Sequence, residues 1–275
     1  MKLHVRHTTH YSYSEPLRYS VQALHLWPSS GPFQTVLEWR LRAPASVTVQ
    51  PECLGNHVHA FSLVARPEDN LRELRVVAEG VVQTHGVAEF EDPPGLPHPF
   101  FYRRPTAHAE SHPRLAAWAR QQLPELAGGN ATPPVATLVR LASAVADKVH
   151  YQPGRTAVET TALEAFDWGL GVCQDQAHVM VAVCRSLGWP ARYVSGYFHA
   201  ANEPELASHA WADVCIDPAA ARWVSLDVTH RCLIDERHVR LAAGSDYMAC
   251  PPIKGVRRGG GDESMTVRVE IEPVP

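Results

Sequence analysis

Apolar and polar residues alternate along much of the first 90 positions, and this alternation predicts β-strands. It is clearest over residues 37–42 and 47–50, where every second residue is apolar. A period of two is typical of a strand with one buried face. Gly55-Asn56 predicts a hairpin turn, and the valine-rich run 74–82 predicts another strand. Short strands separated by turns favour an antiparallel β-sandwich over residues 1–92.

A proline-rich stretch, residues 91–99, interrupts this pattern and predicts a linker or a long crossing loop. Apolar residues then recur at helical spacing, which predicts four helices. Gly169 and Gly188 follow two of them, as expected where a helix ends. The predicted helices cover residues 113–123, 135–149, 162–168 and 173–187.

The pattern returns to strands after Pro190. The predicted strands cover residues 191–197, 209–216, 222–228 and 266–271. Helices followed by an antiparallel sheet are typical of an α+β fold. We therefore predict two domains, the β-rich residues 1–92 and an α+β core formed by residues 100–275.

The composition does not alter the predicted fold, but it argues against nucleic acids and membranes as partners. The 275-residue chain has a formal net charge of −4 and no basic stripe, so nucleic acid is not expected as its main partner. No apolar run approaches the roughly 20 residues that span a bilayer, and the N-terminus has no apolar signal core. We expect a cytoplasmic protein that does not contact membranes. Its six cysteines are expected to be free thiols, because no export signal is present.

Cys173 is the first candidate for chemistry because it opens the helix predicted over residues 173–187. At a helix N-terminus the backbone N–H groups are unpaired and the macrodipole is positive, and both effects stabilise a thiolate. Gly169 and Gly171 allow a tight turn before it. Cys184, on the apolar face of the same helix, fits an inert buried thiol instead. Position alone does not decide between these two roles for Cys173.

A thiolate nucleophile needs a base, and the base needs a group that orients it. His178 is five helical positions from Cys173, a rise of about 7.5 Å and a rotation of about 140°, so it cannot reach the sulfur. His209 begins one predicted strand and Asp227 ends the next. If paired residue numbers sum to about 436 or 438, the two side chains share a face and come within hydrogen-bonding reach. Two surface residues that happen to face each other would give the same pattern.

The three elements together resemble a known family. The motifs are Gly171-Val172-Cys173-Gln174-Asp175, Arg192-Tyr193-Val194-Ser195-Gly196-Tyr197, Ser208-His209-Ala210-Trp211 and Leu226-Asp227-Val228-Thr229. In this order they resemble the core of bacterial transglutaminase-like proteins, and the first 90 residues are similar to the β-rich domain that often precedes that core. The resemblance implies a papain-like fold with Cys173 as nucleophile, His209 as acid and base, and Asp227 orienting His209. Departures such as Gln176 and His230 leave the triad intact and the substrate preference open.

The chemistry implied is cysteine-dependent acyl transfer on an amide bond of a peptide or protein. Cys173 would form a thioester, which water resolves in a peptidase or amidase and an amine resolves in a transglutaminase. The backbone N–H of Cys173 is expected to stabilise the oxyanion, with Gln152 or Trp168 as guesses for the second donor. No cofactor or metal is expected. The cleft is expected to be lined by Trp211, Tyr197, Asp246 and Tyr247, although for Trp211 and Tyr197 the sequence favours core packing over contact with a substrate.

Two other hypotheses about the function are also compatible with the sequence. A metal hydrolase is suggested by the many histidines, with His57 and His59 on one strand face and His4, His7 and His10 near the start; no H-E-x-x-H motif supports it. A non-catalytic protein-binding module on the same scaffold is the other, because a fold does not fix a function. The sequence does not indicate an oligomeric state.

Overall fold

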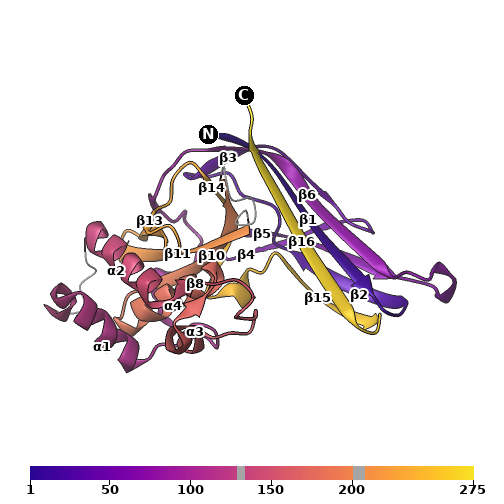
Figure 1. The fold of residues 1–275 in the computed structure, drawn as a ribbon. Coiled ribbons are helices and arrows are strands. Elements are labelled where there is room, and N and C mark those ends of the chain that lie inside the picture. Colours follow the sequence, from indigo (N-terminus) through magenta and orange to yellow (C-terminus); the bar gives the residue numbers. More distant parts are fainter. Residues whose placement is uncertain (129–133, 201–207) are drawn as a thin grey trace.

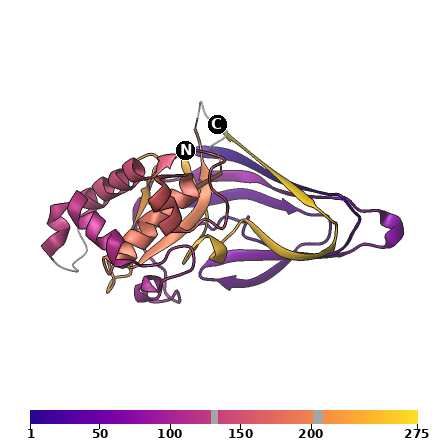
Figure 2. The ribbon, with the colours of Figure 1, turned by 60° about the horizontal axis from the view of Figure 1, so that its bottom comes forward.

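The computed structural model describes residues 1–128, 134–200 and 208–275 as an α+β protein with a β-sandwich beside a mixed core. The sandwich consists of two four-stranded antiparallel sheets, in the orders β16-β1-β6-β3 and β15-β2-β5-β4. Figure 2 shows the helices at one end of the molecule and the sandwich strands at the other. The sandwich strands are β1 (Lys2–Tyr13), β2 (Leu17–Leu24), β3 (Gln34–Arg42), β4 (Thr48–Cys53), β5 (Asn56–Val64), β6 (Glu73–Thr84), β15 (Ile253–Gly259) and β16 (Glu263–Pro273).

The core is an antiparallel sheet in the order β13-β12-β11-β10-β14, with β7 also paired to β12. Its strands are β7 (Glu89–Glu91), β10 (Ala191–Phe198), β11 (Ser208–Asp217), β12 (Arg222–Asp227), β13 (Cys232–Leu233) and β14 (His238–Gly244). The helices that cover it are α1 (Pro113–Gln122), α2 (Val135–Lys148), α3 (Ala162–Trp168) and α4 (Cys173–Ser186). A short parallel pair, β8 (His150–Tyr151) and β9 (Leu170–Gly171), leads into α4. Short 3-10 turns cover Pro67–Asp69, Pro99–Arg103, Pro124–Gly128 and Tyr247–Ala249.

The four predicted helices are confirmed, and local signals explain where they begin and end. Thr161 caps α3 by accepting the Glu164 N–H, and Gly169 follows α3 with φ of 70°, a left-handed conformation that suits glycine. Almost every side chain of α4 is buried, because the other helices and the sheet surround it (Figure 1). Helix α4 is therefore the centre of the core, and its first residue is held in a rigid frame.

The predicted hairpin in the sandwich is confirmed, with its turn one residue earlier than expected. Cys53 pairs with Asn56, so Leu54 and Gly55 form the two-residue turn. Both have positive φ, 55° and 76°, which is the backbone that joins two strands most tightly.

The last two strands belong to the sandwich, although the sequence predicts that residues 100–275 form the core. β15 pairs with β2, and β16 pairs with β1 along its length, from Leu3 opposite Pro273 to Tyr13 opposite Glu263. The sequence pattern predicts a strand within β16, over residues 266–271, but none at β15, and it does not reveal which strand becomes a neighbour. The N- and C-termini consequently lie together at one end of the sandwich (Figure 1).

Contacts between sandwich and core are polar as well as apolar. His7, on the inner face of β1, is only 2% exposed. Its Nδ1 lies 2.9 Å from the Tyr197 hydroxyl of β10, and its Nε2 lies 3.0 Å from the Thr9 hydroxyl. Burial lowers the pKa of His7 to about 4, because the charged imidazolium loses its hydration. His7 therefore joins the two parts of the molecule as a neutral side chain.

This burial predicts an acid-sensitive step in stability. The unfolded chain binds a proton at His7 below about pH 6.5 while the folded chain does not, so stability should fall between pH 6.5 and about 4, by about 3 kcal/mol at most. We expect His7→Gln, which cannot titrate but keeps a hydrogen-bonding amide, to lose less stability over this range in urea unfolding. Parallel stability–pH curves for the two proteins would show that His7 does not contribute.

Candidate active site

The approach to Cys173 is fixed by the residues around it. Cys173 is the first residue of α4, and Val172 before it is extended. The buried Asp175 carboxylate accepts the Val172 N–H and the Thr156 hydroxyl, both at 2.7 Å. A Cβ at Gly171 would lie 2.6 Å from the Asp175 Cβ, so only glycine fits there. The Cys173 N–H lies in the first turn of α4, where it has no intrahelical partner. It makes no hydrogen bond to any described residue.

His209 on β11 and Asp227 at the end of β12 form a buried pair. The His209 Nε2 lies 2.8 Å from the Asp227 Oδ2, and neither side chain has exposed surface. Paired residue numbers sum to 438, as in Asp213 opposite Ser225. Asp227 is thus two positions from the residue directly opposite His209, and it reaches the imidazole diagonally.

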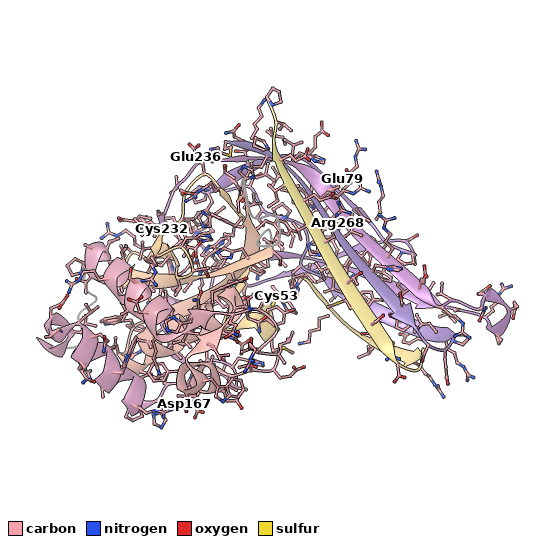
Figure 3. The ribbon with its side chains drawn as sticks, viewed as in Figure 1. Cys53, Glu79, Asp167, Cys232, Glu236 and Arg268 are labelled. Atoms are coloured by element: carbon pink, nitrogen blue, oxygen red, sulfur yellow. The ribbon has the colours of Figure 1, made fainter. Side chains whose placement is uncertain are left out.

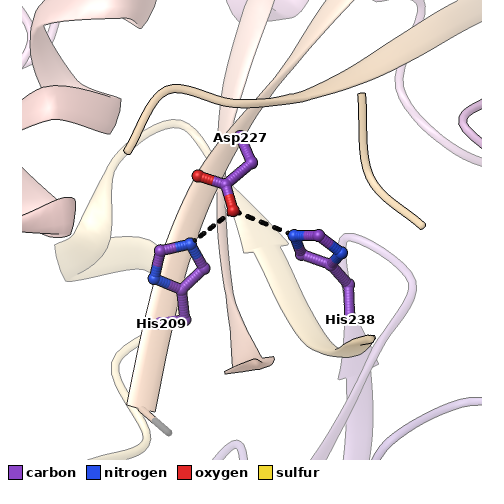
Figure 4. Close-up of side chains that lie close together, drawn as sticks. All are labelled: His209, Asp227 and His238. Carbon is purple, nitrogen blue, oxygen red and sulfur yellow. Dashed lines mark hydrogen bonds and ion pairs between the residues drawn. The ribbon is translucent and has the colours of Figure 1, made fainter. Parts of the chain in front are cut away.

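Asp227 binds two further imidazoles. The His238 Nε2 lies 2.9 Å from the Asp227 Oδ2, as Figure 4 shows beside His209. The His230 Nδ1 lies 2.7 Å from the same oxygen, and the His230 backbone N–H donates to Oδ1 at 3.1 Å. Burial would raise the pKa of Asp227, but the charge of His209 and the hydrogen bonds of all three histidines hold it well below its usual range. Asp227 is therefore a carboxylate in the folded protein.

These contacts set the protonation of His209. Its Nε2 faces the carboxylate and carries a proton, while its buried Nδ1 has no hydrogen-bond partner among the described residues. Burial alone would lower the pKa of His209, but the charge and hydrogen bond of Asp227, together with the proximity of Cys173, raise it to about 10. An imidazolium beside Cys173 stabilises a thiolate. The arrangement can accordingly hold a nucleophile and an acid side by side.

Comparison with known proteins shows which family the chain belongs to. The family model of the transglutaminase-like superfamily matches residues 121–228, and that of the bacterial transglutaminase-like N-terminal region matches residues 3–83. The chain belongs to the transglutaminase-like superfamily. Among solved structures it is similar to a proposed cysteine protease from Cytophaga hutchinsonii, with a TM-score of 0.75 and 20% identity over 99% of this chain and 90% of that one. This likeness concerns the fold.

Relatives in mycobacteria match over nearly their full length. An uncharacterized protein of Mycobacterium leprae is 32% identical over 98% of each chain. An uncharacterized protein of Mycobacterium tuberculosis is 27% identical over 98% of this chain and 92% of its own. The two mycobacterial proteins therefore match this chain across both of the regions that the family models cover.

In this transglutaminase-like protein Cys173 and His209 belong to the lining of a cleft of about 770 Å³. One side of the cleft is the core, from the start of α4 and from β10 and β11. The other side is the sandwich, where His7, Thr9 and Tyr11 of β1 and most of β16 line the cleft. The volume lies in the range of ligand sites in proteins. The sandwich thus shapes the space in front of the candidate nucleophile.

Of the four residues predicted to line the cleft, two do so in the structure and two do not. Tyr197 and Tyr247 do line it, whereas Trp211 and Asp246 are buried outside its lining. Trp211 shares a strand face with His209, but its ring packs against Gly196 on the neighbouring strand, where a Cβ would collide with it. The lining of the described cleft also lacks Gln152 and Trp168, our guesses for a second oxyanion donor.

Tyr193 is a cleft residue that the sequence did not single out. Its ring is 2% exposed and lies between His178 and Tyr247, with ring centroids 4.9 and 6.1 Å away. Its hydroxyl makes no hydrogen bond to the described residues. Burial, and then the charge of Cys173, raise the pKa of Tyr193 well above its usual value. The phenol is therefore a neutral, uncommitted donor beside the thiol.

The histidines that suggested a metal site do not assemble in the structure. His7 faces inward, while His4 and His10 face Glu79 and Glu73 on the other face of β1. His57 pairs with Glu52, and His59 stacks on Trp27. Within the described residues the spacing of a metal site is met by His209, Asp227 and His238, whose atoms are already joined by hydrogen bonds (Figure 4). None of the described helices is long and apolar enough to cross a membrane.

The role of Asp227 can be tested through the reactivity of Cys173. We expect Asp227→Asn to slow alkylation of Cys173 by iodoacetamide at pH 5–6 by about tenfold or more, because a neutral amide stabilises the imidazolium far less than a carboxylate does. Peptide mass spectrometry would measure the rate at Cys173 among the six cysteines. Asp235→Asn is the matched control, since the Asp235 Oδ1 lies 3.2 Å from the His238 Nδ1, on the side of that ring away from Asp227. Equal rates in both variants and the wild type would exclude this role.

Proposed function

We propose that the protein is a cysteine-dependent acyl-transfer enzyme that acts on amide bonds of peptides or proteins through Cys173, His209 and Asp227. The observation that carries the proposal is the buried imidazole of His209, held at Nε2 by Asp227 at 2.8 Å with its Nδ1 unoccupied beside a cysteine at a helix N-terminus. Cysteine acyl transfer requires this combination of an activated thiolate, a proton donor and a fixed orientation. Membership of the transglutaminase-like superfamily supports it.

The first half of the reaction uses both charges of the pair. The Cys173 thiolate attacks the amide carbonyl carbon, and the electron pair of the C=O bond moves to oxygen. When the C–N bond breaks, the proton on the His209 Nδ1 passes to the leaving nitrogen, which departs as a neutral amine. A thioester on Cys173 and a neutral imidazole remain.

The second half reverses these proton transfers. Neutral His209 accepts a proton at Nδ1 from the incoming nucleophile, which attacks the thioester carbonyl and displaces the Cys173 sulfur as thiolate. Water as the nucleophile gives hydrolysis, and a primary amine gives transamidation. Met265 and Val267 in the cleft lining are about half exposed, so solvent reaches the cleft. This favours hydrolysis, because transfer to an amine requires that water be kept away.

Two donors are available for the oxyanion. The Cys173 N–H and the Tyr193 hydroxyl both lack partners among the described residues, and both residues belong to the lining of the cleft. A pair of preorganised donors stabilises the tetrahedral intermediate more than the flat carbonyl. We assign Tyr193 as the second donor in place of Gln152 and Trp168.

The reaction can be followed with disordered β-casein and a fluorescent primary amine. We expect new casein fragments if water resolves the thioester and labelled casein if the amine does, and a covalent acyl adduct of Cys173 in acid-quenched samples. Cys173→Ala should abolish all three signals, while Cys53→Ala, which removes the exposed cysteine of the sandwich, should leave them intact. Activity that survives Cys173→Ala would refute the proposal, and an inactive wild type whose Cys173 is also unreactive would favour a binding module.

The role of Tyr193 predicts a specific kinetic change. Tyr193→Phe keeps the ring and removes only the donor, so kcat should fall by about 10²–10³ while KM changes little. The alkylation rate of Cys173 at pH 6 should stay within about twofold, because the thiolate–imidazolium pair is untouched. An unchanged kcat would remove Tyr193 from the oxyanion site, and an equal loss of alkylation would indicate a structural role instead.

A further inference from the structure

The strand β16 forms one edge of its sheet and pairs only with β1 among the described strands. It is 11 residues long. In Figure 3 the label Arg268 marks β16, and the label Glu79 marks β6 of the same sheet. Exposed edges of such length invite pairing with another chain, and proteins usually shorten or cover them. An uncovered edge of this kind beside a candidate nucleophile requires an explanation.

The register shows which backbone groups of β16 are unpaired. The Val274 N–H donates to the Lys2 carbonyl at 3.0 Å, and hydrogen-bonded positions alternate along an antiparallel pair. Even-numbered residues of β16 therefore bond to β1. The N–H and C=O groups that point away from the sheet belong to Met265, Val267, Val269 and Ile271, none of which bonds to another described residue.

This free edge faces the cleft. Successive side chains of a strand point to opposite faces, yet residues 267–272 all line the cleft that holds Cys173 and His209. Lining residues from both faces mean that the edge itself borders the cleft. Two apolar side chains of the inner face, Met265 and Val267, are 54% and 46% exposed. The edge thus offers a row of donors and acceptors with an apolar strip beside it.

We propose that an extended segment of a polypeptide substrate adds to β16 as a further strand and so brings its reactive amide to Cys173. This inference rests on the proposed function and specifies how the substrate binds. A strand added at the usual spacing of about 4.8 Å lies within the cleft, its main chain bonded to the outward groups and alternate side chains over Met265 and Val267. Main-chain pairing gives affinity with little sequence preference, so the substrates are disordered chains or chain ends rather than folded surfaces.

Amide hydrogen exchange of the Cys173→Ala protein tests this without any catalysis. In NMR spectra the amides of residues 265, 267, 269 and 271 should exchange fast in the free protein and at least tenfold more slowly with excess β-casein. The amides of residues 266, 268 and 270, already bonded to β1, should not change. This alternation distinguishes strand addition from general shielding of the cleft.

Variants of neighbouring residues give the matched control. Val267→Pro removes one outward N–H without touching the bonds to β1 and should weaken binding of labelled β-casein about tenfold. Thr266→Ala, whose N–H points to β1 and whose side chain lies outside the cleft lining, should bind like the parent. Retained protection at residues 268 and 270 verifies that the sheet is intact in both.

Each other outcome overturns the proposal. Outward amides that stay fast with β-casein would exclude strand addition, whether or not casein binds elsewhere. Outward amides that are slow in the free protein and become fast on dilution would place a second copy of this chain on the edge. Failure of the proposed function is seen separately, as an unreactive Cys173 in the wild type, while the exchange pattern in Cys173→Ala still tests the binding mode.

Discussion

The candidate site depends on one buried carboxylate, that of Asp227. A carboxylate without exposed surface is costly unless several donors satisfy it. Here three imidazoles and a backbone N–H do so, at 2.7 to 3.1 Å. Because the donors come from β11, from the loop after β12 and from β14, satisfying one charge fixes the relative positions of these elements. The orientation of His209 is a consequence of that constraint.

The second constraint is topological. After β6 the chain forms the core. It then returns to the sandwich, where β15 and β16 each add an edge strand to one of the two sheets. The position of β16 therefore depends on β1, and β1 is tied to the core through His7 and Tyr197. In this way a β-rich domain that carries none of Cys173, His209 and Asp227 supplies one side of the cleft. The position of this domain relative to Cys173 therefore shapes the candidate site as much as those three residues do.

Local signals in the sequence sufficed to predict the helices, the position of Cys173 at the start of α4 and the pairing of His209 with Asp227. Thr161, Gly169 and Gly171 define the segment that presents Cys173, and strand alternation places His209 and Asp227 on one face. The strand β1 gave no such signal, because its inward positions include His7 and Thr9, which become buried only by bonding to each other and to Tyr197. The contacts of His230 and His238 with Asp227, like the pairing of β16, join residues whose proximity follows from the fold and not from spacing.

The core sheet carries a second buried carboxylate, that of Asp213, whose partners differ in chemistry from those of Asp227. Asp213, on the same face of β11 as His209, binds Arg192 at 2.8 Å and Arg240 at 2.6 Å. Burial would raise the pKa of Asp213, but the two arginines lower it. Guanidinium groups do not release protons in proteins. This cluster therefore stays charged and holds β10, β11 and β14 together. Asp227 is held as firmly, but by imidazoles, whose ring nitrogens can both release and accept a proton. An acyl-transfer cycle needs a charge that is held in place and a proton that moves, and of these two clusters only that of Asp227 supplies both.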